Sequence, residues 1–552
     1  MFKNIDGVIS FNTQAFALAN PCVWSTCEGL PAEERNYTIS CCNLQVPLNY
    51  AKSNQSLIRI SMVRFSPPNP NNNTLFLLNG GPGEAGLGAI GVVGQLIPAE
   101  YGITLIAPDH RGTGFSSPLG CDDHNSQIVT MDCITYLTNR WTIEGLNQFS
   151  TTSAAHDLSI QIQASQSTGR IAILALSYGT YWLNRFLDIY PNLAQAAVMD
   201  SPLNLLLHGF TMYNIRAASV ALQFLSYCHY QIECIQYFPN DSPAIMLNKI
   251  LQEIDSNKQK CTNTFLTKYN LTSSIIKKTF FRMFQSAGYH YDRTVIPAVI
   301  FRLNRCNQED VATLDFFFNA QDLSPTSSNE TSPSDANGLV LDSDALFNNI
   351  AFSELWLEFN QSEVDQQTLN TWQNATIIAP DLRSDFVALR QAWPKYPLDE
   401  YRYHLANSSV LMIAGQLDGA TPLDFASHLA SITGKIRTLY SIPLSGHIIQ
   451  SFITATGYTC PLHLILSWAF PALFPSEWND PACIRDLPTT IDFVGATVMG
   501  QMSSMKLLNV SLPFGSTNTS QPGNIAPSHD SASLFISSLC LTYISRFFLD
   551  IQ

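Results

Sequence analysis

The sequence predicts an α/β fold in which a mostly parallel sheet is flanked by helices and carries a large, mainly helical inserted cap domain. Short β-branched runs alternate with helical stretches from about residue 40, and helical periodicity replaces this pattern between 206 and 400. No segment repeats with a fixed period, which argues against solenoids and propellers. The predicted divisions are an N-terminal segment (1–39), a first core part (40–205), the insertion (206–400), a second core part (401–490) and a C-terminal tail with a hydrophobic end (491–552).

The predicted strands are short apolar or β-branched runs. The first run alternates with a period of two, and most of the others are continuously apolar. The runs span residues 57–63, 74–78, 103–107, 171–176, 196–200, 410–414 and 438–442. Within the insertion, helical periodicity is clearest at 215–227 and 344–359, and the Ser-, Pro- and Asn-rich stretch 324–337 predicts a mobile loop.

The charge balance argues against nucleic acid as a partner. The net charge is −14 and no basic run is longer than Lys277-Lys278, whereas a phosphate-binding surface needs clustered basic residues. Only 13% of the residues are charged, so glycans on N-x-S/T sequons offer another source of solubility. The sequon asparagines are Asn36, Asn54, Asn72, Asn240, Asn270, Asn329, Asn360, Asn374, Asn407, Asn509 and Asn518.

The cysteines favour a disulfide-bonded protein of the secretory pathway. The chain has 13 cysteines, so at least one thiol is left over. Several stand in polar loops where burial does not explain them, namely Cys22, Cys27, Cys121, Cys133, Cys460 and Cys483. A zinc site is the alternative, but the sequence lacks a C-x2-C pair and an H-x3-5-H partner. No metal and no cofactor is therefore predicted.

Both ends carry incomplete targeting signals. Residues 17–19 resemble a signal-peptide cleavage site, but polar residues 12–14 interrupt the preceding apolar region. A polar stretch at 511–533 precedes an apolar one at 534–549, which is the order of a glycolipid-anchor signal. A C-terminal helix is the alternative, and polar residues at the extreme end count against the anchor. We expect an extracellular or cell-surface protein, with membrane attachment through the tail as one of two outcomes.

A serine in a strand-to-helix turn is the candidate nucleophile. The apolar run 171–176 leads into Ser177-Tyr178-Gly179-Thr180, and a helix is predicted over 181–189. A nucleophile elbow has this context, because it presents a serine hydroxyl at the N-terminal end of a helix. Ala175 replaces the first glycine of the G-x-S-x-G consensus, but its small side chain still lets strand and helix approach. Taken alone, a serine in a strand-to-helix turn is structural more often than catalytic.

A glycine-rich turn follows the run 74–78. Its sequence, Asn79-Gly80-Gly81-Pro82-Gly83, lets backbone N–H groups converge on one point, as an oxyanion hole requires. We assign the predicted oxyanion donors to the N–H groups of Gly81 and Tyr178. The alternatives are a plain glycine turn or a phosphate loop, and no Lys-Ser/Thr follows to support the latter.

An acid and a histidine follow the last two predicted strands. Asp418 comes shortly after the run 410–414, and His447 lies on the loop after 438–442. Serine, acid and histidine in this chain order are typical of the α/β-hydrolase fold. The sequence therefore predicts a catalytic triad of Ser177, His447 and Asp418, although each residue alone has an ordinary structural interpretation.

These motifs resemble the tripeptidyl aminopeptidase and proline iminopeptidase branch of the α/β-hydrolases, over about 40–205 and 400–490. Asn49 and Asn79 depart from it, since the tripeptidyl branch has Asp and proline iminopeptidases have His at these positions. The matching segments are Cys42–Tyr50, Gly80–Gly83, Asp109–Ser116 (similar to D-x-R-G-x-G-x-S), Ser177–Thr180 and the stretch holding Cys460, Leu473–Pro475 and Cys483. The last segment is similar to one peculiar to the tripeptidyl branch, which implies a Cys460–Cys483 disulfide.

The resemblance implies a serine exopeptidase that releases residues from free peptide N-termini through an acyl-enzyme. In that family the cap closes the site and acidic groups hold the substrate's amino terminus, which makes Glu354 a candidate substrate-binding residue. The alternative for Glu354 is the wet face of an amphipathic helix. Two other functions fit the sequence: a carboxylesterase with the same triad, and a catalytically inactive, glycosylated surface-binding ectodomain. The oligomeric state is not predicted.

Overall fold

The computed structural model describes residues 20–52, 56–122, 126–259, 261, 265, 268–285, 292–321, 341–380 and 386–515. The signal-peptide region, the predicted mobile loop at 324–337 and the apolar end at 534–549 lie outside these residues. Within the described ranges, no helix is both long enough and apolar enough to cross a bilayer.

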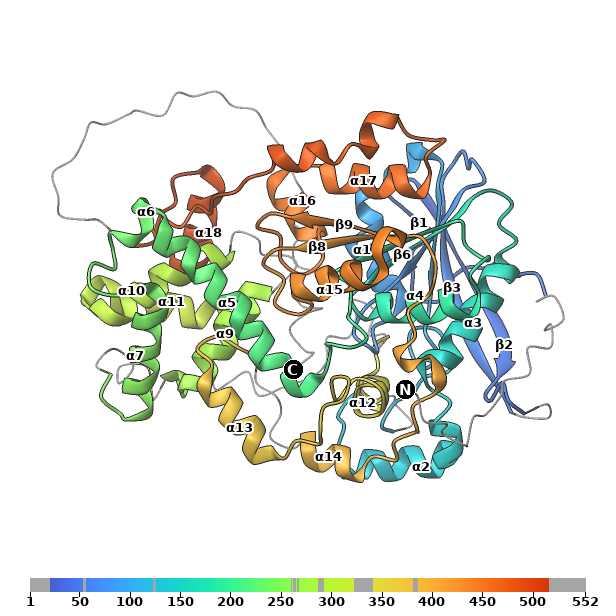
Figure 1. The fold of residues 1–552 in the computed structure, drawn as a ribbon, viewed down its shortest axis with the longest axis horizontal. Coiled ribbons are helices and arrows are strands. Elements are labelled where there is room, and N and C mark those ends of the chain that lie inside the picture. Colours follow the sequence, from blue (N-terminus) through green and yellow to red (C-terminus); the bar gives the residue numbers. More distant parts are fainter. Residues whose placement is uncertain are drawn as a thin grey trace.

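A mixed sheet lies at the centre of the core (Figure 1). Its nine strands in the described residues have the order β1-β2-β3-β5-β4-β6-β7-β8-β9. They are β1 (Glu33–Glu34), β2 (Tyr37–Pro47), β3 (Leu57–Ser66), β4 (Thr74–Leu78), β5 (Thr104–Pro108), β6 (Ile171–Leu176), β7 (Ala196–Asp200), β8 (Val410–Gly415) and β9 (Arg437–Ile442). Strands β1, β2, β3 and β5 pair antiparallel, and pairing from β5 to β9 is parallel.

All of the predicted strands are present within one to three residues of the expected ends. The antiparallel edge formed by β1 and β2 was not predicted. In β2, the adjacent residues Cys41 and Cys42 are both buried and form disulfides with Cys27 and Cys22, which interrupts the alternation that marks a half-buried strand.

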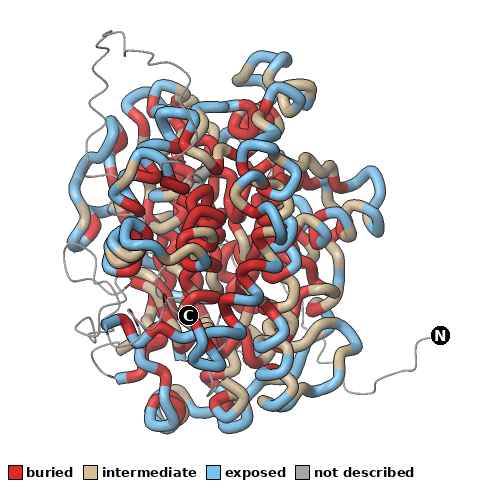
Figure 2. Tube along the Cα trace, turned by 90° about the vertical axis from the view of Figure 1, so that its left-hand side faces the viewer, coloured by how far each residue is buried: buried red, intermediate tan, exposed pale blue. Residues whose placement is uncertain are grey.

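The strands at the centre of the sheet are buried on both faces, which explains their continuous apolar runs. Side chains of one strand alternate between two cores: Phe76 and Leu78 of β4 join one cluster, whereas Leu75 and Leu77 join the other. Helices α2 (Met131–Leu146), α3 (Thr151–Ser165), α4 (Tyr178–Ile189) and α15 (Leu423–Thr433) contribute to the first cluster. Helices α1 (Gly86–Val92), α16 (Gln450–Thr456) and α17 (Cys460–Ala469) contribute to the second. Figure 2 shows the resulting buried centre.

The insertion is helical and has a hydrophobic core of its own. Its helices are α5 (Tyr213–Tyr230), α6 (Ile232–Ile235), α7 (Pro243–Asp255), α9 (Ser273–Gln285), α10 (Ile296–Arg305), α11 (Gln308–Ala320), α12 (Asp344–Ser353), α13 (Gln366–Ala375) and α14 (Phe386–Ala392). Helices α12, α13 and α14 are exceptions, because Leu346, Leu369 and Leu389 pack into the cluster of the sheet domain. The predicted helix 344–359 ends at Ser353.

The first part of the predicted C-terminal tail packs on this insertion. Helix α18 (Val498–Leu508) packs against α11 (Figure 1), and Leu508 joins the hydrophobic core of the insertion. The Arg302 Nε atom donates to the Pro513 carbonyl at 2.7 Å, and Lys506 pairs with Asp292 at 2.7 Å. Residues 491–515 therefore fold with a region more than 200 positions earlier in the chain.

Short 3-10 turns connect these elements: η1 (Gly94–Leu96), η2 (Ala99–Tyr101), η3 (Phe210–Met212), η4 (Asp292–Val295), η5 (Glu400–Tyr403), η6 (Gly434–Ile436), η7 (Ser476–Asn479) and η8 (Pro481–Asp486). Disulfides join Cys22–Cys42, Cys27–Cys41, Cys121–Cys133, Cys228–Cys234, Cys261–Cys306 and Cys460–Cys483. The remaining cysteine, Cys540, lies outside the described residues.

Candidate active site

Ser177 stands on a strained turn between β6 and α4. Its backbone has φ 50° and ψ −122°, a combination that lifts a side chain clear of the chain on either side. Gly179 is required here, because a side-chain carbon at this position would lie 2.5 Å from the Asn79 carbonyl oxygen. Ala175 is fully buried in the core. The strand-to-helix elbow predicted from sequence is present, with the helix starting at Tyr178.

The glycine-rich turn after β4 lies directly against Ser177. A side-chain carbon at Gly80 would be 3.1 Å from Ser177 Cβ and 3.6 Å from its Oγ. The Asn79 side chain donates to the Ala85 carbonyl at 2.8 Å and closes the turn. The Tyr178 N–H opens α4, where backbone N–H groups have no acceptor within the helix. Oxyanion binding by Gly81 and Tyr178 remains a prediction that this arrangement permits.

Asp418 and His447 form a buried pair at the carboxyl ends of β8 and β9. The His447 Nδ1 atom lies 2.9 Å and 3.0 Å from the two Asp418 oxygens. Asp418 also accepts from the Thr421 hydroxyl at 2.8 Å, from the Thr421 N–H at 2.8 Å and from the Ala420 N–H at 2.9 Å. The carboxylate is therefore fixed against one ring nitrogen, which leaves Nε2 as the atom that can exchange a proton with a nucleophile.

Electrostatics keep this pair in the charge states that a triad needs. Burial alone would raise the Asp418 pKa, but the adjacent His447 and the hydrogen bonds from Thr421 outweigh it and lower that pKa. Burial alone would lower the His447 pKa, but the Asp418 carboxylate outweighs it and raises that pKa. Asp418 thus stays ionised, and the imidazolium that would form during proton transfer is stabilised.

The loop bearing His447 is held by residues that sequence reasoning missed. The backbone is left-handed at Leu444 (φ 55°) and Ile448 (φ 60°), on either side of the histidine. The Ser201 hydroxyl accepts from the Ile448 N–H at 2.8 Å, and the Asp200 carboxyl accepts from the Ile449 N–H at 3.1 Å. Burial raises the Asp200 pKa to about 7. The only sequence signal for these roles was that Asp200 ends a predicted strand.

The insertion also contacts both triad loops. Arg293, on η4, donates to the Leu444 carbonyl and lies near Gly446, where a side-chain carbon would be 3.4 Å from Nη1. Phe284 of α9 abuts Gly419, the neighbour of Asp418, where a side-chain carbon would be 2.8 Å from the ring. The insertion therefore packs on the site itself.

Glu84 is a further acidic group beside Ser177 that the sequence analysis did not single out. It is half-buried, and its Oε2 lies 3.2 Å from the point where a side-chain carbon of Gly80 would stand. Burial and the nearby Asp342 carboxylate raise the Glu84 pKa to about 8. Its position after the glycine turn was the signal that could have identified it.

Glu354 is buried rather than on a wet helix face. The backbone N–H of Thr151 donates to its carboxylate at 3.0 Å, the hydroxyls of Tyr181 and Tyr396 donate at 2.7 and 2.6 Å, and Arg185 lies 3.5 Å away. Burial would raise the Glu354 pKa, but Arg185 and the tyrosine hydroxyls outweigh it and lower that pKa. These contacts give Glu354 a structural role, and its substrate-binding role remains a prediction.

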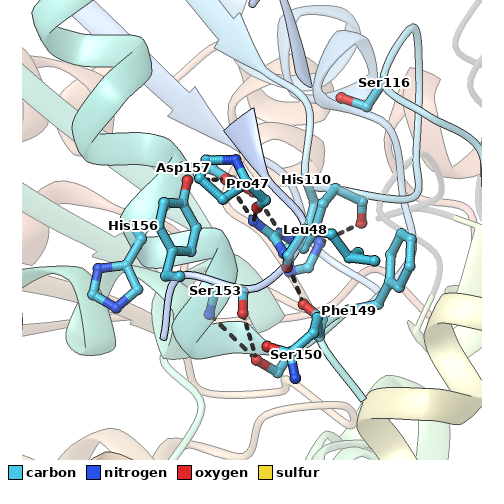
Figure 3. Close-up of polar contacts among 12 residues, drawn as sticks. Pro47, Leu48, His110, Ser116, Phe149, Ser150, Ser153, His156 and Asp157 are labelled. Atoms are coloured by element: carbon cyan, nitrogen blue, oxygen red, sulfur yellow. Dashed lines mark hydrogen bonds and ion pairs between the residues drawn. The ribbon is translucent and has the colours of Figure 1, made fainter. Parts of the chain in front are cut away.

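The segment Asp109–Ser116 forms a second buried charge network, part of which is drawn in Figure 3. The Arg111 guanidinium donates to the two Asp157 oxygens at 2.7 Å each, and both side chains are fully buried. It also donates to the backbone carbonyls of Leu48 at 2.8 Å and Gln148 at 2.9 Å. These bonds tie the end of β2 to α3, and His110 of the same segment lies 3.3 Å from the Tyr178 hydroxyl.

Comparison with known proteins identifies the fold. Residues 73–227 match a family model described as the alpha/beta hydrolase fold. This range contains the glycine turn and Ser177. No curated protein sequence matches this chain closely enough to count as a relative.

Solved structures of several activities are similar to the chain at low identity. A proline iminopeptidase from Mycobacterium smegmatis is 12% identical with a TM-score of 0.36, over 78% of this chain and 99% of that one. A bromoperoxidase from Bacillus anthracis is 14% identical with a TM-score of 0.31, over 77% and 99%. An esterase from Exiguobacterium antarcticum is 12% identical with a TM-score of 0.28, over 71% and 90%. The matched family model, together with the mostly parallel sheet flanked by helices, shows that this chain has the α/β-hydrolase fold.

Proposed function

We propose that the protein is a serine hydrolase that acts as an exopeptidase on peptides with a free amino terminus. The observation that carries the proposal is the Asp418–His447 pair at the end of the sheet that also presents Ser177 on a nucleophile elbow. The motif resemblance to tripeptidyl aminopeptidases and proline iminopeptidases favours a peptide substrate. The contact of the insertion with both triad loops is consistent with a cap that limits access to the site.

In the proposed reaction Ser177 Oγ attacks the scissile carbonyl while His447 Nε2 accepts its proton. The developing oxyanion is held by the N–H groups of Gly81 and Tyr178. His447 then gives the proton to the leaving amine, and an acyl-enzyme on Ser177 remains. Water, activated by the same histidine, hydrolyses this ester and restores the serine. Asp418 keeps the imidazole in the correct tautomer throughout.

A substrate panel tests the proposal. The wild type should hydrolyse aminoacyl or peptidyl anilides that carry a free amine, and Ser177→Ala should lower kcat by about 10⁴- to 10⁶-fold with the fold intact. Unchanged activity in that variant would exclude Ser177 as the nucleophile. Turnover of short acyl esters alone would identify a carboxylesterase. No turnover of any substrate would favour the inactive surface-binding ectodomain.

We also propose that the protein is a secreted glycoprotein. The sequon asparagines within the described residues are all exposed: Asn36, Asn72, Asn240, Asn270, Asn360, Asn374, Asn407 and Asn509. The disulfides of the described residues are typical of an oxidising compartment. Treatment of the expressed protein with an N-glycosidase should lower its apparent mass, and an unchanged mass would contradict the proposal.

A further inference from the structure

We propose that Glu84 binds the substrate's α-ammonium group and thereby limits cleavage to a single amino-terminal residue. This inference rests on the proposed exopeptidase function. It adds a specificity residue that lies on the glycine turn, and it fixes how many residues are released.

The carboxyl group of Glu84 and the hydroxyl of Ser177 border the same small space. Measured from the point where a side-chain carbon of Gly80 would stand, Glu84 Oε2 is 3.2 Å away and Ser177 Oγ is 3.6 Å away. The two oxygens are therefore separated by no more than the sum of these distances. The Gly80 N–H faces the Glu84 carboxyl and favours its ionised form. A ligand at the nucleophile thus also meets Glu84.

This separation suits one amino-acid residue. Within a residue, the amino nitrogen and the carbonyl carbon are two bonds, or about 2.5 Å, apart. A charge-assisted contact of about 2.8 Å to Glu84 and an attack distance of about 3 Å from Ser177 lengthen this reach to about 8 Å when fully extended. A bent path through one residue therefore covers the whole range allowed for the two oxygens. Each further residue would lengthen an extended substrate by about 3.5 Å, so a tripeptide unit would carry its ammonium group well past Glu84.

The charge environment of Glu84 also favours a cationic ligand. No Lys or Arg side chain among the described residues forms an ion pair with it, in contrast to Glu354, which has Arg185. The neighbouring acidic side chain, Asp342, adds negative charge and accepts the Ala85 N–H at 2.8 Å. The nearby His447 lowers the Glu84 pKa, but burial and Asp342 outweigh it. A substrate ammonium would add positive charge and favour the ionised form of the carboxyl.

The test compares the wild type with Glu84→Gln and with Glu28→Gln, a control at an exposed position. The substrates are alanine 4-nitroanilide, its N-acetyl form, the di- and trialanyl anilides, and a neutral butyrate ester. Wild type and Glu28→Gln should favour the single-residue anilide over the trialanyl one. Glu84→Gln should lower kcat/KM for alanine 4-nitroanilide by about 30-fold or more, mainly through KM, because a buried charge loses its partner. Hydrolysis of the neutral butyrate ester should lose at least about tenfold less than hydrolysis of the anilide in this variant, because the ester has no ammonium group.

Several results would overturn the inference while leaving the proposed function in place. One is a wild type that favours the trialanyl anilide, a comparison that needs no variant. Another is an equal loss on all substrates in Glu84→Gln, which would indicate a structural role. If that variant does not fold, Glu84→Asp takes its place, and an unchanged preference for the free amine there would also count against Glu84. By contrast, failure of the wild type to hydrolyse any of these substrates would overturn the proposed function itself.

Discussion

Asp418 and Asp157 are both fully buried carboxylates that face a nitrogen-bearing side chain at hydrogen-bond distance. Asp157 faces Arg111, whose guanidinium keeps its proton at any physiological pH. Its other donors go to backbone carbonyls, so that network is closed. Asp418 faces His447, which can gain and lose a proton. Burial of a charge pair therefore does not by itself mark a candidate active site. A partner that can gain and lose a proton, beside a candidate nucleophile, distinguishes the Asp418–His447 pair.

The largest loss of activity is expected from substitution of Asp418, the carboxylate that faces a titratable side chain. Asp418→Asn would present an amide to His447 Nδ1 and favour the wrong tautomer, so kcat should fall by about 10⁴-fold. Thermal unfolding should change little. Asp424→Asn, on the exposed side of α15, is the matched control. A loss of less than about tenfold in Asp418→Asn would show that this carboxylate does not orient the histidine.

The corresponding change at Asp157 should affect stability instead. Asp157→Asn leaves Arg111 buried without its counter-charge, which should lower the free energy of unfolding by about 3–5 kcal/mol. The folded fraction should keep kcat within about threefold, as Asp157 does not touch the site. Denaturant unfolding and steady-state kinetics measure the two effects, with the exposed Asp132→Asn as the control. Equal losses of activity and stability would show that the Arg111–Asp157 network is coupled to the Asp418–His447 pair.

The pH dependence of activity and stability should further distinguish the Asp418–His447 pair from the Asp157–Arg111 pair. His447 must be neutral to accept the serine proton, and its pKa is raised above 6.5. Hydrolysis of a neutral ester should therefore fall about tenfold per unit as pH decreases below that raised pKa. The stabilising contribution of protonated His447 is complete below about 6.5 and is lost as pH rises through the raised pKa. Activity should thus increase with pH over the range in which the stabilising contribution of protonated His447 declines. A midpoint of the activity profile below pH 6.5 would contradict the assignment of His447 as the base.

A smaller effect is expected from the hydroxyl of Thr421. Thr421→Val removes one of the donors to Asp418, and kcat should fall about tenfold because hydrogen bonds to charged groups contribute about 1.5 kcal/mol or more. Thr433→Val, near the end of α15, removes a hydroxyl that bonds only a backbone carbonyl and serves as the control. Identical kinetics in the two variants would leave Thr421 without a positioning role.

The sheet and the positions of the candidate triad residues at its carboxyl edge were predictable because local pattern encodes them. Parallel strands buried on both faces are continuous apolar runs, and functional residues stand at their carboxyl ends, as Ser177 and Asp418 do. The fold class is confirmed. The chain order of serine, acid and histidine could be predicted for the same reason.

The contacts that complete the site were not predictable, since they join residues far apart in sequence. Arg111 meets Asp157, Arg293 meets Leu444, and α18 packs on the insertion, yet no local period records such pairings. Glu354 was assigned from resemblance alone, and only the structure shows that its carboxylate is already held by other side chains.

Covalent labelling of Ser177 tests the central claim most directly. A neutral fluorophosphonate should phosphonylate the folded wild type, and mass spectrometry of its peptides should place the adduct on Ser177. Labelling should be absent in Ser177→Ala and slower by orders of magnitude in Asp418→Asn. A folded wild type that takes no adduct, or takes it on another serine, would contradict the assignment of Ser177 as the nucleophile.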